Sequence, residues 1–475
     1  MPRPEARPQP SLEPEYCKGC GRCIDACARH CIEPGTRIDP LTGLVPVSLH
    51  LDDCNACGLC IDACPEPYGL VAGRGAAVEH GLLAETEPAP EMPTPDGPRR
   101  PTRAVADRPS TRLPLPEGRP LILKGAHASA IGALLAGCRH FFGYPITPST
   151  EGAELMARLL PALDGHFVQA VSEVAAVNMM YGCGGAGLPC MTFTSSPGFS
   201  LMLEGISYMI GAEVPGVIVD VMRGGPGLGN IGPEQSDIKL LCRGLGHGGT
   251  HAVVLAPATP QEMLDFTQLA FHLAFRYRNP VILAADGYLG QMTGKVLLPA
   301  AATRPGLPGW AVHGDAEHRG NLVSSIFLSE TDLEAHNRHL QAKYLRIAKA
   351  EQRADLYRCG DAEVLLVACN TPARMAKGAV RALREEGIAA GLFRPQTLWP
   401  FPIRALAPLL EQVRTLVVVE ASEGQLEDEL RLALSHAGVG HHLELRHVRR
   451  MGGVLPSQRE IVEAVRGAAR RRARA

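Results

Sequence analysis

The stretch GVIVDVM, at residues Gly216–Met222, is a short and almost continuous apolar run, as is typical of a β-strand buried on both faces. Two similar runs flank it along the chain, MTFTSS at residues 191–196 and PVILAAD at Pro280–Asp286. Stretches of helical periodicity separate the runs, with glycine and proline at the joins. Strands and helices that alternate in this way predict a parallel sheet with helices on both faces. We therefore predict an α/β domain over residues 119–300.

A second, smaller α/β domain is predicted over residues 361–475. Its first strand is the apolar run AEVLLVACN, and an amphipathic helix follows that ends at Gly387. Further strand patterns lie at residues 388–396 and 413–420, and a closing helix begins near Ser457. Residues 301–360 connect the two domains and include a charged helical stretch.

Residues 76–118 are rich in proline, as in ETEPAPEMPTPDGPRRPTR, and are predicted to form an extended linker. The whole chain of 475 residues has a net charge of −2, which gives no attraction to nucleic acid or to an anionic membrane. No apolar run approaches the ~20 residues of a spanning helix. The first ten residues lack the apolar core of a secretory signal. We expect a cytoplasmic protein without a nucleic-acid or membrane partner.

A cysteine-rich domain is predicted over residues 10–75, where the spacing C-x2-C-x2-C-x3-C occurs twice. This repeat is typical of two-cluster bacterial ferredoxins, in which the fourth cysteine of each run binds the other cluster. One 4Fe–4S cluster would then take Cys17, Cys20, Cys23 and Cys64, and the other Cys54, Cys57, Cys60 and Cys27. Structural zinc sites pair two C-x2-C knuckles instead, so zinc is the weaker interpretation. Cys31 is an extra thiol, and the six cysteines outside this domain have no ligand spacing.

Polar residues in the larger α/β domain have two interpretations each. The hydroxyls of Thr147, Ser149 and Thr150 lie on a proline-rich loop before a predicted helix, where they could hold an anion or cap the helix. Glu173 is either a partner of a helix dipole or a partly buried acid available for proton transfer. Arg223 follows a predicted strand, where it either binds a ligand or forms a salt bridge. Asn230, Gln235 and Asp237 could approach the substrate or a partner subunit, and loop capping explains them equally well. His247 and His251 are more simply loop residues than ligands.

Five ordered motifs between about Leu121 and Val465 resemble the α subunit of 2-oxoacid:ferredoxin oxidoreductases, and 2-ketoisovalerate ferredoxin oxidoreductase most of all. They are YPITPS at residues 144–149, the SE-x-A-A helix from Ser172, MRGGPGLGNIGPEQSD at 222–237, YRNPVILAADGYLGQM at 277–292 and RPQTLWPFP at 394–402. The resemblance implies a pyrimidine-binding domain of the thiamine-enzyme type over residues 119–300 and a transketolase-C-like domain over residues 361–475. The cysteine-rich domain resembles the separate δ subunit of these enzymes, fused here to the α subunit.

The resemblance also implies residue roles. The residue matching Glu173 contacts N1′ of thiamine diphosphate, while Thr147 and Arg223 match residues that hold the substrate carboxylate. Tyr144 and Pro145 belong to the same cofactor-binding loop. Thiamine enzymes normally hold Mg²⁺ and the diphosphate with a GDG motif, which this sequence lacks. A β subunit is therefore expected to hold Mg²⁺ and to share the thiamine site.

The implied reaction is the oxidation of a 2-oxo acid with CoA as co-substrate, giving acyl-CoA and CO2, with electrons passing through the clusters to ferredoxin. The MRGGPGLGNIGPEQSD motif favours a branched-chain acid such as 2-oxoisovalerate, whereas 2-oxoglutarate, pyruvate or an aryl glyoxylate are alternatives. A γ subunit is expected as a further partner. An interpretation from another class is a non-catalytic subunit that only carries electrons and docks partners.

Overall fold

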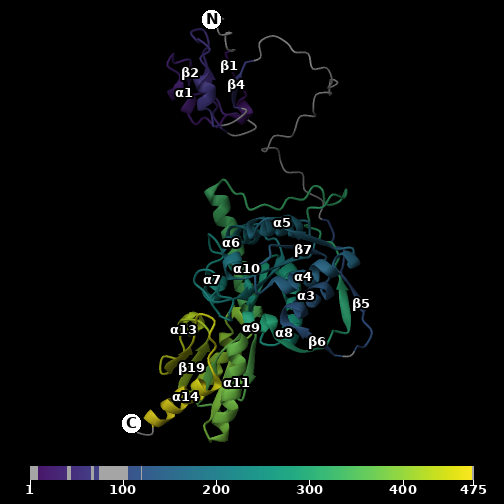
Figure 1. The fold of residues 1–475 in the computed structure, drawn as a ribbon, viewed down its shortest axis with the longest axis vertical. Helices are drawn as coiled ribbons and strands as arrows, with labels where there is room; N and C mark the ends of the chain where they lie inside the picture. Colours follow the sequence, from purple (N-terminus) through teal and green to yellow (C-terminus); the bar gives the residue numbers. More distant parts are fainter. Residues whose placement is uncertain (1–8, 40–43, 66–68, 74–104, 119, 473–475) are drawn as a thin grey trace. The chain divides into compact units, whose positions relative to one another are not determined.

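The computed structural model describes residues 9–39, 44–65, 69–73, 105–118 and 120–472. The chain divides into two compact units, Met1–Pro98 and Arg99–Ala475, which are described separately here (Figure 1). Most of the predicted linker, residues 76–104, lies outside the described residues. Within the described ranges, no helix has both the length and the apolar character needed to cross a membrane.

The first unit contains two short helices, α1 (Arg22–Ala26) and α2 (Leu59–Ala63), which pack against each other. Each begins after a glycine in the left-handed region, Gly21 with φ 77° and Gly58 with φ 81°, because the chain turns sharply between its second and third cysteine. Two small antiparallel ladders complete the unit. They pair β1 (Pro10–Leu12) with β4 (Leu70–Ala72) and β2 (Ile32–Glu33) with β3 (Ser48–Leu49).

The second unit is built on a seven-stranded sheet. Its order is β18 (Thr397–Trp399), β11 (Val253–Leu255), β12 (Pro280–Asp286), β10 (Gly216–Met222), β9 (Cys190–Thr194), β7 (His140–Gly143) and β8 (His166–Gln169). All neighbouring strands are parallel except β18, which runs antiparallel to β11. Every residue of β10 and β12 is buried, which confirms the prediction of a parallel sheet covered on both faces.

Two groups of helices cover this sheet. One consists of α5 (Glu173–Gly185) and α6 (Ser196–Gly211), which pack on each other and on β10. The other contains α3 (Gly125–Leu135), α4 (Thr150–Leu159) and α8 (Pro260–Tyr277), with α3 packed on both of the others. Strand β7 lies between the two groups in Figure 1. Two short helices, α7 (Ile238–Arg243) and α9 (Gly287–Gln291), follow β10 and β12 along the chain.

Peripheral segments are paired onto this body. Strand β6 (Leu121–Lys124) pairs with β13 (Thr293–Val296), and β5 (Thr111–Pro114) pairs with β14 (Ala301–Arg304). The last part of the predicted linker therefore lies against the body as an added strand. The charged stretch expected in the connector forms α10 (Glu330–Ala350).

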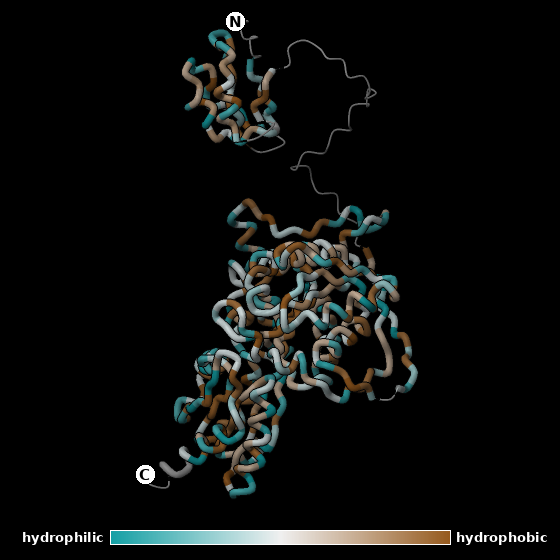
Figure 2. The backbone as a smooth tube through the Cα atoms, viewed as in Figure 1, coloured by the Kyte–Doolittle hydropathy of each residue, from teal (hydrophilic) through white to brown (hydrophobic). Residues whose placement is uncertain are grey.

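The C-terminal part has its own five-stranded sheet. Its order is β15 (Ala354–Tyr357), β17 (Ala390–Pro395), β16 (Val364–Val367), β19 (Thr415–Glu420) and β20 (Glu444–Arg449). Only β15 is antiparallel to its neighbour. The accompanying helices are α11 (Asn370–Glu385), α12 (Ile403–Leu406), α13 (Gln425–Ala437) and α14 (Gln458–Arg472). Figure 2 shows hydrophobic residues gathered in the interior of this part, where every residue of β19 is buried.

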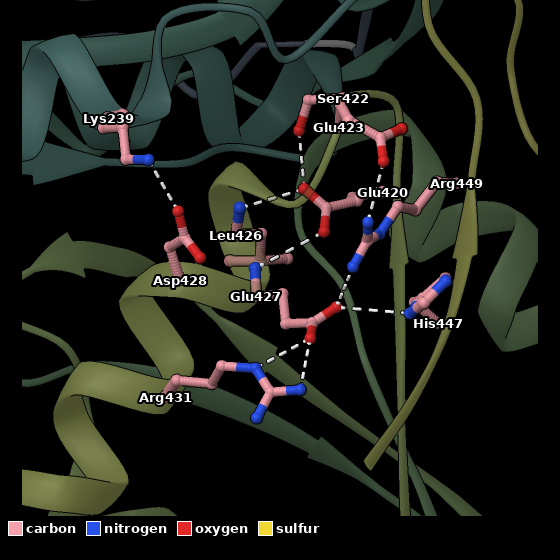
Figure 3. Close-up of polar contacts among 10 residues, drawn as sticks. All are labelled: Lys239, Glu420, Ser422, Glu423, Leu426, Glu427, Asp428, Arg431, His447 and Arg449. Atoms are coloured by element: carbon pink, nitrogen blue, oxygen red, sulfur yellow. Dashed lines mark hydrogen bonds and ion pairs between the residues drawn. The ribbon is translucent and has the colours of Figure 1, made fainter.

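The two sheets of this unit are joined by shared contacts. Strand β18 leaves the C-terminal part to enter the larger sheet. Gln235 is fully buried, and its side-chain amide donates to the carbonyl of Cys369 at 3.3 Å and accepts from the N–H of Ala421 at 2.8 Å. Helix α7 pairs with α13 through Lys239 and Asp428 (Figure 3).

Candidate functional site

The predicted site residues of the second unit lie at the carboxyl ends of neighbouring parallel strands. Arg223 directly follows β10, and α6 begins two residues after β9 ends at Thr194. The loop of residues 144–149 directly follows β7, the next strand along. Because parallel strands end at the same edge of a sheet, the fold brings these segments together where α/β proteins bind ligands.

Glu173 is the first residue of α5, and Ser172 caps this helix by accepting from the N–H of Ala175. The Glu173 side chain is 5% exposed and points toward the start of α6. A Cβ atom on Gly198 would lie 2.4 Å from both Glu173 Oε1 and Thr194 Oγ1. The glycine therefore leaves the space that the carboxyl group occupies.

Arg223 is also almost fully buried, and its Nη1 donates to the backbone carbonyl of Thr147. This contact brings two of the predicted residues together through the backbone of one of them. Ser149 does not cap α4 with its side chain, since its hydroxyl donates to the carbonyl of Ile146 at 2.7 Å. Tyr144, Pro145 and Thr147 itself are exposed on the loop.

Several buried polar atoms at this edge lack a hydrogen-bond partner among the described residues. They are Thr194 Oγ1, Ser195 Oγ and Arg223 Nε. Buried polar groups are normally hydrogen-bonded, so such a group of atoms is typical of a site that a polar ligand completes. A buried carboxyl group such as that of Glu173 can bind a protonatable ring nitrogen, and a buried guanidinium such as that of Arg223 can bind a carboxylate.

A cavity of about 590 Å³ lies beside this edge. Its walls come from the glycine-rich loop at residues 224–228, from Ser196 and Asp237, and from Glu423 and Met451 of the C-terminal part. Exposed apolar side chains lie on the segments that carry the site: Val171 and Val174 are close to Glu173 in the sequence, Tyr144 is on the loop after β7, and Leu201 is on α6. A surface that faces only water rarely exposes so many apolar side chains together. These four residues, the apolar rim of the site, therefore resemble a surface that another chain covers.

In the first unit, the buried cysteines Cys23 and Cys60 have expected co-ligands as neighbours. Burial first, and then the charges of Cys17, Cys64 and Cys20, raise the pKa of Cys23 to about 11. Burial likewise raises the pKa of Cys60, to which the charges of Cys27 and Cys54 add. Iron must therefore displace protons when it binds these thiols.

A cavity of about 170 Å³ is lined by Cys27, Cys54, Cys57 and Cys60, which is one of the two predicted ligand sets. The extra thiol of Cys31 lines the same cavity, and its backbone N–H donates to Cys27 Sγ at 3.3 Å. Four thiols around one cavity, with a fifth close by, fit a cubane of iron and sulfide.

The other polar residues considered in the sequence have structural partners. Gln235 joins the two sheets, and Asn230 bonds Gly452 and Gly232. His247 contacts Ser207 at 3.0 Å, and the ring of His251 stacks on Trp399 at 4.6 Å. The sequence reasoning passed over Gly198 and Asp220, although an aspartate inside an apolar strand was a visible signal.

Three family models match this sequence. The model described as pyruvate flavodoxin/ferredoxin oxidoreductase, thiamine diphosphate-binding, matches residues 131–350, and pyruvate:ferredoxin oxidoreductase core domain II matches residues 362–461. A 4Fe–4S dicluster domain matches residues 16–67.

Curated relatives are similar along most of their length. Ketoisovalerate oxidoreductase subunit VorB of Methanothermobacter marburgensis is 48% identical over 347 residues, which cover 73% of this chain and 97% of that subunit. The 2-oxoglutarate synthase subunit KorA of Methanocaldococcus jannaschii is 34% identical over 368 residues, covering 73% of this chain and 99% of that one.

A solved structure has a similar fold. It is the 2-oxoglutarate:ferredoxin oxidoreductase from Magnetococcus marinus, with 2-oxoglutarate, coenzyme A and succinyl-CoA bound. The TM-score is 0.65 at 26% identity, and the match covers 73% of this chain and 65% of the solved chain.

Proposed function

This chain belongs to the 2-oxoacid:ferredoxin oxidoreductases, and on that premise we propose that it is their α-type subunit with a cluster-bearing δ-like domain fused at its N-terminal side. The observation that carries the proposal is the grouping of Glu173, Thr147 and Arg223 at one sheet edge, beside buried polar atoms that have no hydrogen-bond partner in the described parts of the chain. The enzyme would oxidise a 2-oxo acid in the presence of CoA to acyl-CoA and CO2.

Thiamine diphosphate, when bound, supplies the carbon nucleophile and the electron sink that decarboxylation of a 2-oxo acid requires. The contribution of this chain is to bind and to orient. Glu173 would hold the cofactor at N1′ through its carboxyl group, whose position the start of α6 fixes. Tyr144 and Pro145, on the loop after β7, would line the same cofactor site.

Arg223 and Thr147 would hold the substrate carboxylate. The guanidinium is already anchored at Nη1 by the Thr147 carbonyl, while Nε has no partner among the residues that the structure describes. A buried guanidinium with a free donor is suited to bind a carboxylate through a charge-assisted hydrogen bond. Anchoring one nitrogen fixes the direction of the other donors.

Two 4Fe–4S clusters in the first unit would carry the electrons away one at a time. The proposed ligands are Cys17, Cys20, Cys23 and Cys64 for one cluster, and Cys54, Cys57, Cys60 and Cys27 for the other. The neighbours of Cys23 and Cys60 support this assignment. Ferredoxin is the proposed final acceptor.

A β subunit would complete the site by holding Mg²⁺ and the diphosphate. The apolar rim of the site supports a partner at this position, since water would otherwise surround Val171, which is 87% exposed. We further propose a γ subunit and a cytoplasmic location, in line with an enzyme that depends on soluble ferredoxin and reduced clusters.

The substrate is proposed to be a branched-chain 2-oxo acid such as 2-oxoisovalerate. The relative with 48% identity carries the ketoisovalerate name, whereas those named for 2-oxoglutarate are less similar. The test is anaerobic purification of the complex through a tag on this chain, followed by CoA-dependent viologen reduction with 2-oxoisovalerate, 2-oxoglutarate, pyruvate and phenylglyoxylate in parallel. The highest kcat/KM is expected for 2-oxoisovalerate, and a clear preference for another acid would overturn the substrate proposal.

Variants of the same complex distinguish a catalytic subunit from one that only transfers electrons. Glu173→Ala is expected to reduce turnover by at least about 100-fold, as is typical when a group that assists proton transfer is removed. Glu154→Ala, on the exposed side of α4, is the matched control and is expected to retain activity. Unchanged turnover in an assembled Glu173→Ala complex would favour the non-catalytic interpretation.

A further inference from the structure

Asp220 is an acid inside the apolar strand β10, and its side chain is fully buried. No N–H or hydroxyl group among the described residues donates to either carboxyl oxygen in ordinary geometry, although the backbone N–H of Ser196 lies close enough to favour the charged form slightly. An ionised carboxylate without partners is very costly at such a position. The group must therefore find a proton or a donor.

Asp237 supplies the acceptor for such a proton. It lies at the start of α7, it is 7% exposed, and its carboxyl group is in hydrogen-bonding contact with that of Asp220. Burial first, and then the neighbouring charge of Asp237, raise the pKa of Asp220 well above its usual value. Two carboxyl groups in contact cannot both ionise at low cost, and one shared proton converts their repulsion into a hydrogen bond.

The acid pair is connected to the backbone of Arg223 by two serines. The Ser196 hydroxyl donates to Asp237 Oδ2 and accepts from the N–H of Arg223 at 3.1 Å. The Ser236 hydroxyl donates to the carbonyl of Arg223 at 2.8 Å. Because Asp237 directs the Ser196 hydroxyl proton toward itself, the serine oxygen is left free to accept from Arg223.

Other charges near the pair have their own functions. Glu234 accepts from the N–H of Gly225 at 3.1 Å and from that of Gly452 at 2.9 Å, which holds the glycine-rich loop. The guanidinium of Arg223 points away to Thr147 and forms no ion pair with either aspartate. Neither Glu234 nor Arg223 therefore neutralises the charge of Asp220 and Asp237.

We propose that Asp220 and Asp237 share one proton and act as a positioning pair that fixes the backbone of Arg223 through Ser196. In this arrangement Asp220 donates, Asp237 carries the single negative charge, and the strand end that presents the arginine is held rigid. The role in substrate binding rests on the proposed function, whereas the shared proton does not depend on it.

The first test is infrared spectroscopy on the anaerobically purified complex. A protonated carboxyl group gives a C=O stretching band that shifts on exchange into D2O. This band is expected in the wild-type complex and in the control Glu154→Gln, and it is expected to be absent from Asp220→Asn. A wild-type spectrum without any band that Asp220→Asn removes would overturn the shared proton.

The second test is the kinetics of the same variants. Asp220→Ala and Asp237→Asn are expected to raise KM for the 2-oxo acid about tenfold with a smaller change in kcat, because a lost hydrogen bond to a charged group costs on the order of 1.4 kcal/mol. Asp220→Asn is expected to rescue KM to within about threefold of the wild type, since its amide donates permanently.

The outcomes separate the two proposals. An inactive wild-type complex that still shows the Asp220 band would contradict the proposed function and leave the pair intact. An active complex in which Asp220→Asn is as defective as Asp220→Ala would contradict the positioning pair alone. If the Asp237→Asn complex fails to assemble, the comparison of wild type, Asp220→Asn and Asp220→Ala still tests the positioning pair.

Discussion

Gly198 and the carboxyl group of Glu173 can lie side by side only because glycine has no side chain: any Cβ at residue 198 would lie 2.4 Å from Glu173 Oε1. Such a separation is far below van der Waals contact, so one of the two groups has to move. Both lie on the first turns of rigid helices, and the short carboxyl side chain would move first. At the scale of single residues, the position of the proposed catalytic acid thus depends on an absent methyl group.

Gly198→Ala is therefore expected to weaken thiamine diphosphate binding by about 1–3 kcal/mol, the usual cost of inserting a methyl group into a packed site. Titration of the apo complex with the cofactor measures this change. Gly182→Ala on α5 is the matched control, since a Cβ there meets nothing within 4 Å. Equal affinity in Gly198→Ala and the wild type would contradict this account of the site.

The crossed ligand sets of the clusters can also be tested at this scale. Under the proposed assignment, Cys20 and Cys64 bind the same cluster, so Cys20→Ser/Cys64→Ser is expected to lose about half of the bound iron. Cys20→Ser/Cys27→Ser is expected to lose nearly all of it, because each cluster loses one ligand. Iron analysis of the anaerobic protein distinguishes these results, and the reverse order would show that each run binds its own cluster.

The sequence was informative about residues whose type is unusual for their surroundings. Glu173 among small residues and Arg223 after an apolar strand attracted notice for that reason, and the fold places both at one sheet edge. Whether they perform the expected roles stays a prediction. The roles of Gly198 and Asp220 depend on contacts between segments far apart in sequence, which residue type alone does not reveal.

At the scale of elements, α13 is held by charges at its first turns (Figure 3). The carboxylate of Glu420 accepts from the N–H groups of Leu426 and Glu427, which caps the helix. Glu427 is itself buried and bonds Arg431 and Arg449. Burial alone would raise the pKa of Glu427, but these two arginines bring it below its usual value.

Glu427→Gln is expected to lower the free energy of unfolding by about 1–2 kcal/mol. Only the Glu427 side chain is buried, since Arg431 is 57% and Arg449 22% exposed, and Arg449 keeps its bond to Glu423. The control is Asp428→Asn on the same helix, whose ion pair with Lys239 is about half exposed and is expected to contribute under about 1 kcal/mol. Thermal or denaturant unfolding of the complex measures both.

The stability of α13 is expected to depend on pH through Glu427 and its two arginine partners. A carboxyl group whose pKa is lowered by folding contributes stability above the unfolded value, about 4.3 for glutamate, and loses it as the pH falls further. The difference in stability between wild type and Glu427→Gln is therefore expected to shrink in acid. A difference that stays constant down to about pH 3 would contradict the ion-pair explanation.

Regular elements were predictable where their periodicity was strong, as for β10, β12, α8 and α11. Strand β18 was not, because three residues from the C-terminal part pair with a distant strand of the larger sheet. Strand β5 was assigned to the linker for a similar reason, since its pairing with β14 is not visible in a proline-rich composition.

At the scale of the whole molecule, the family, the α/β fold with a dicluster domain, and the type of reaction predicted from five motifs and the cysteine spacing are confirmed by the comparisons. Motifs and spacings of this kind reflect local chemistry and so can be read from one sequence. The domain boundaries, the substrate and the roles of the partner subunits stay predictions, because they depend on surfaces that other chains complete.

The central claim is that oxidation of a 2-oxo acid at the Glu173 site reduces the clusters of the first unit. The most direct measurement is electron paramagnetic resonance of the anaerobic complex, frozen after addition of 2-oxoisovalerate and CoA, with Cys20→Ser/Cys64→Ser and Glu173→Ala alongside. The account predicts signals of reduced 4Fe–4S clusters in the wild type, the loss of one cluster's signal in the cysteine variant and no substrate-dependent signal in Glu173→Ala. Cluster reduction by substrate that is undiminished in Glu173→Ala would contradict it.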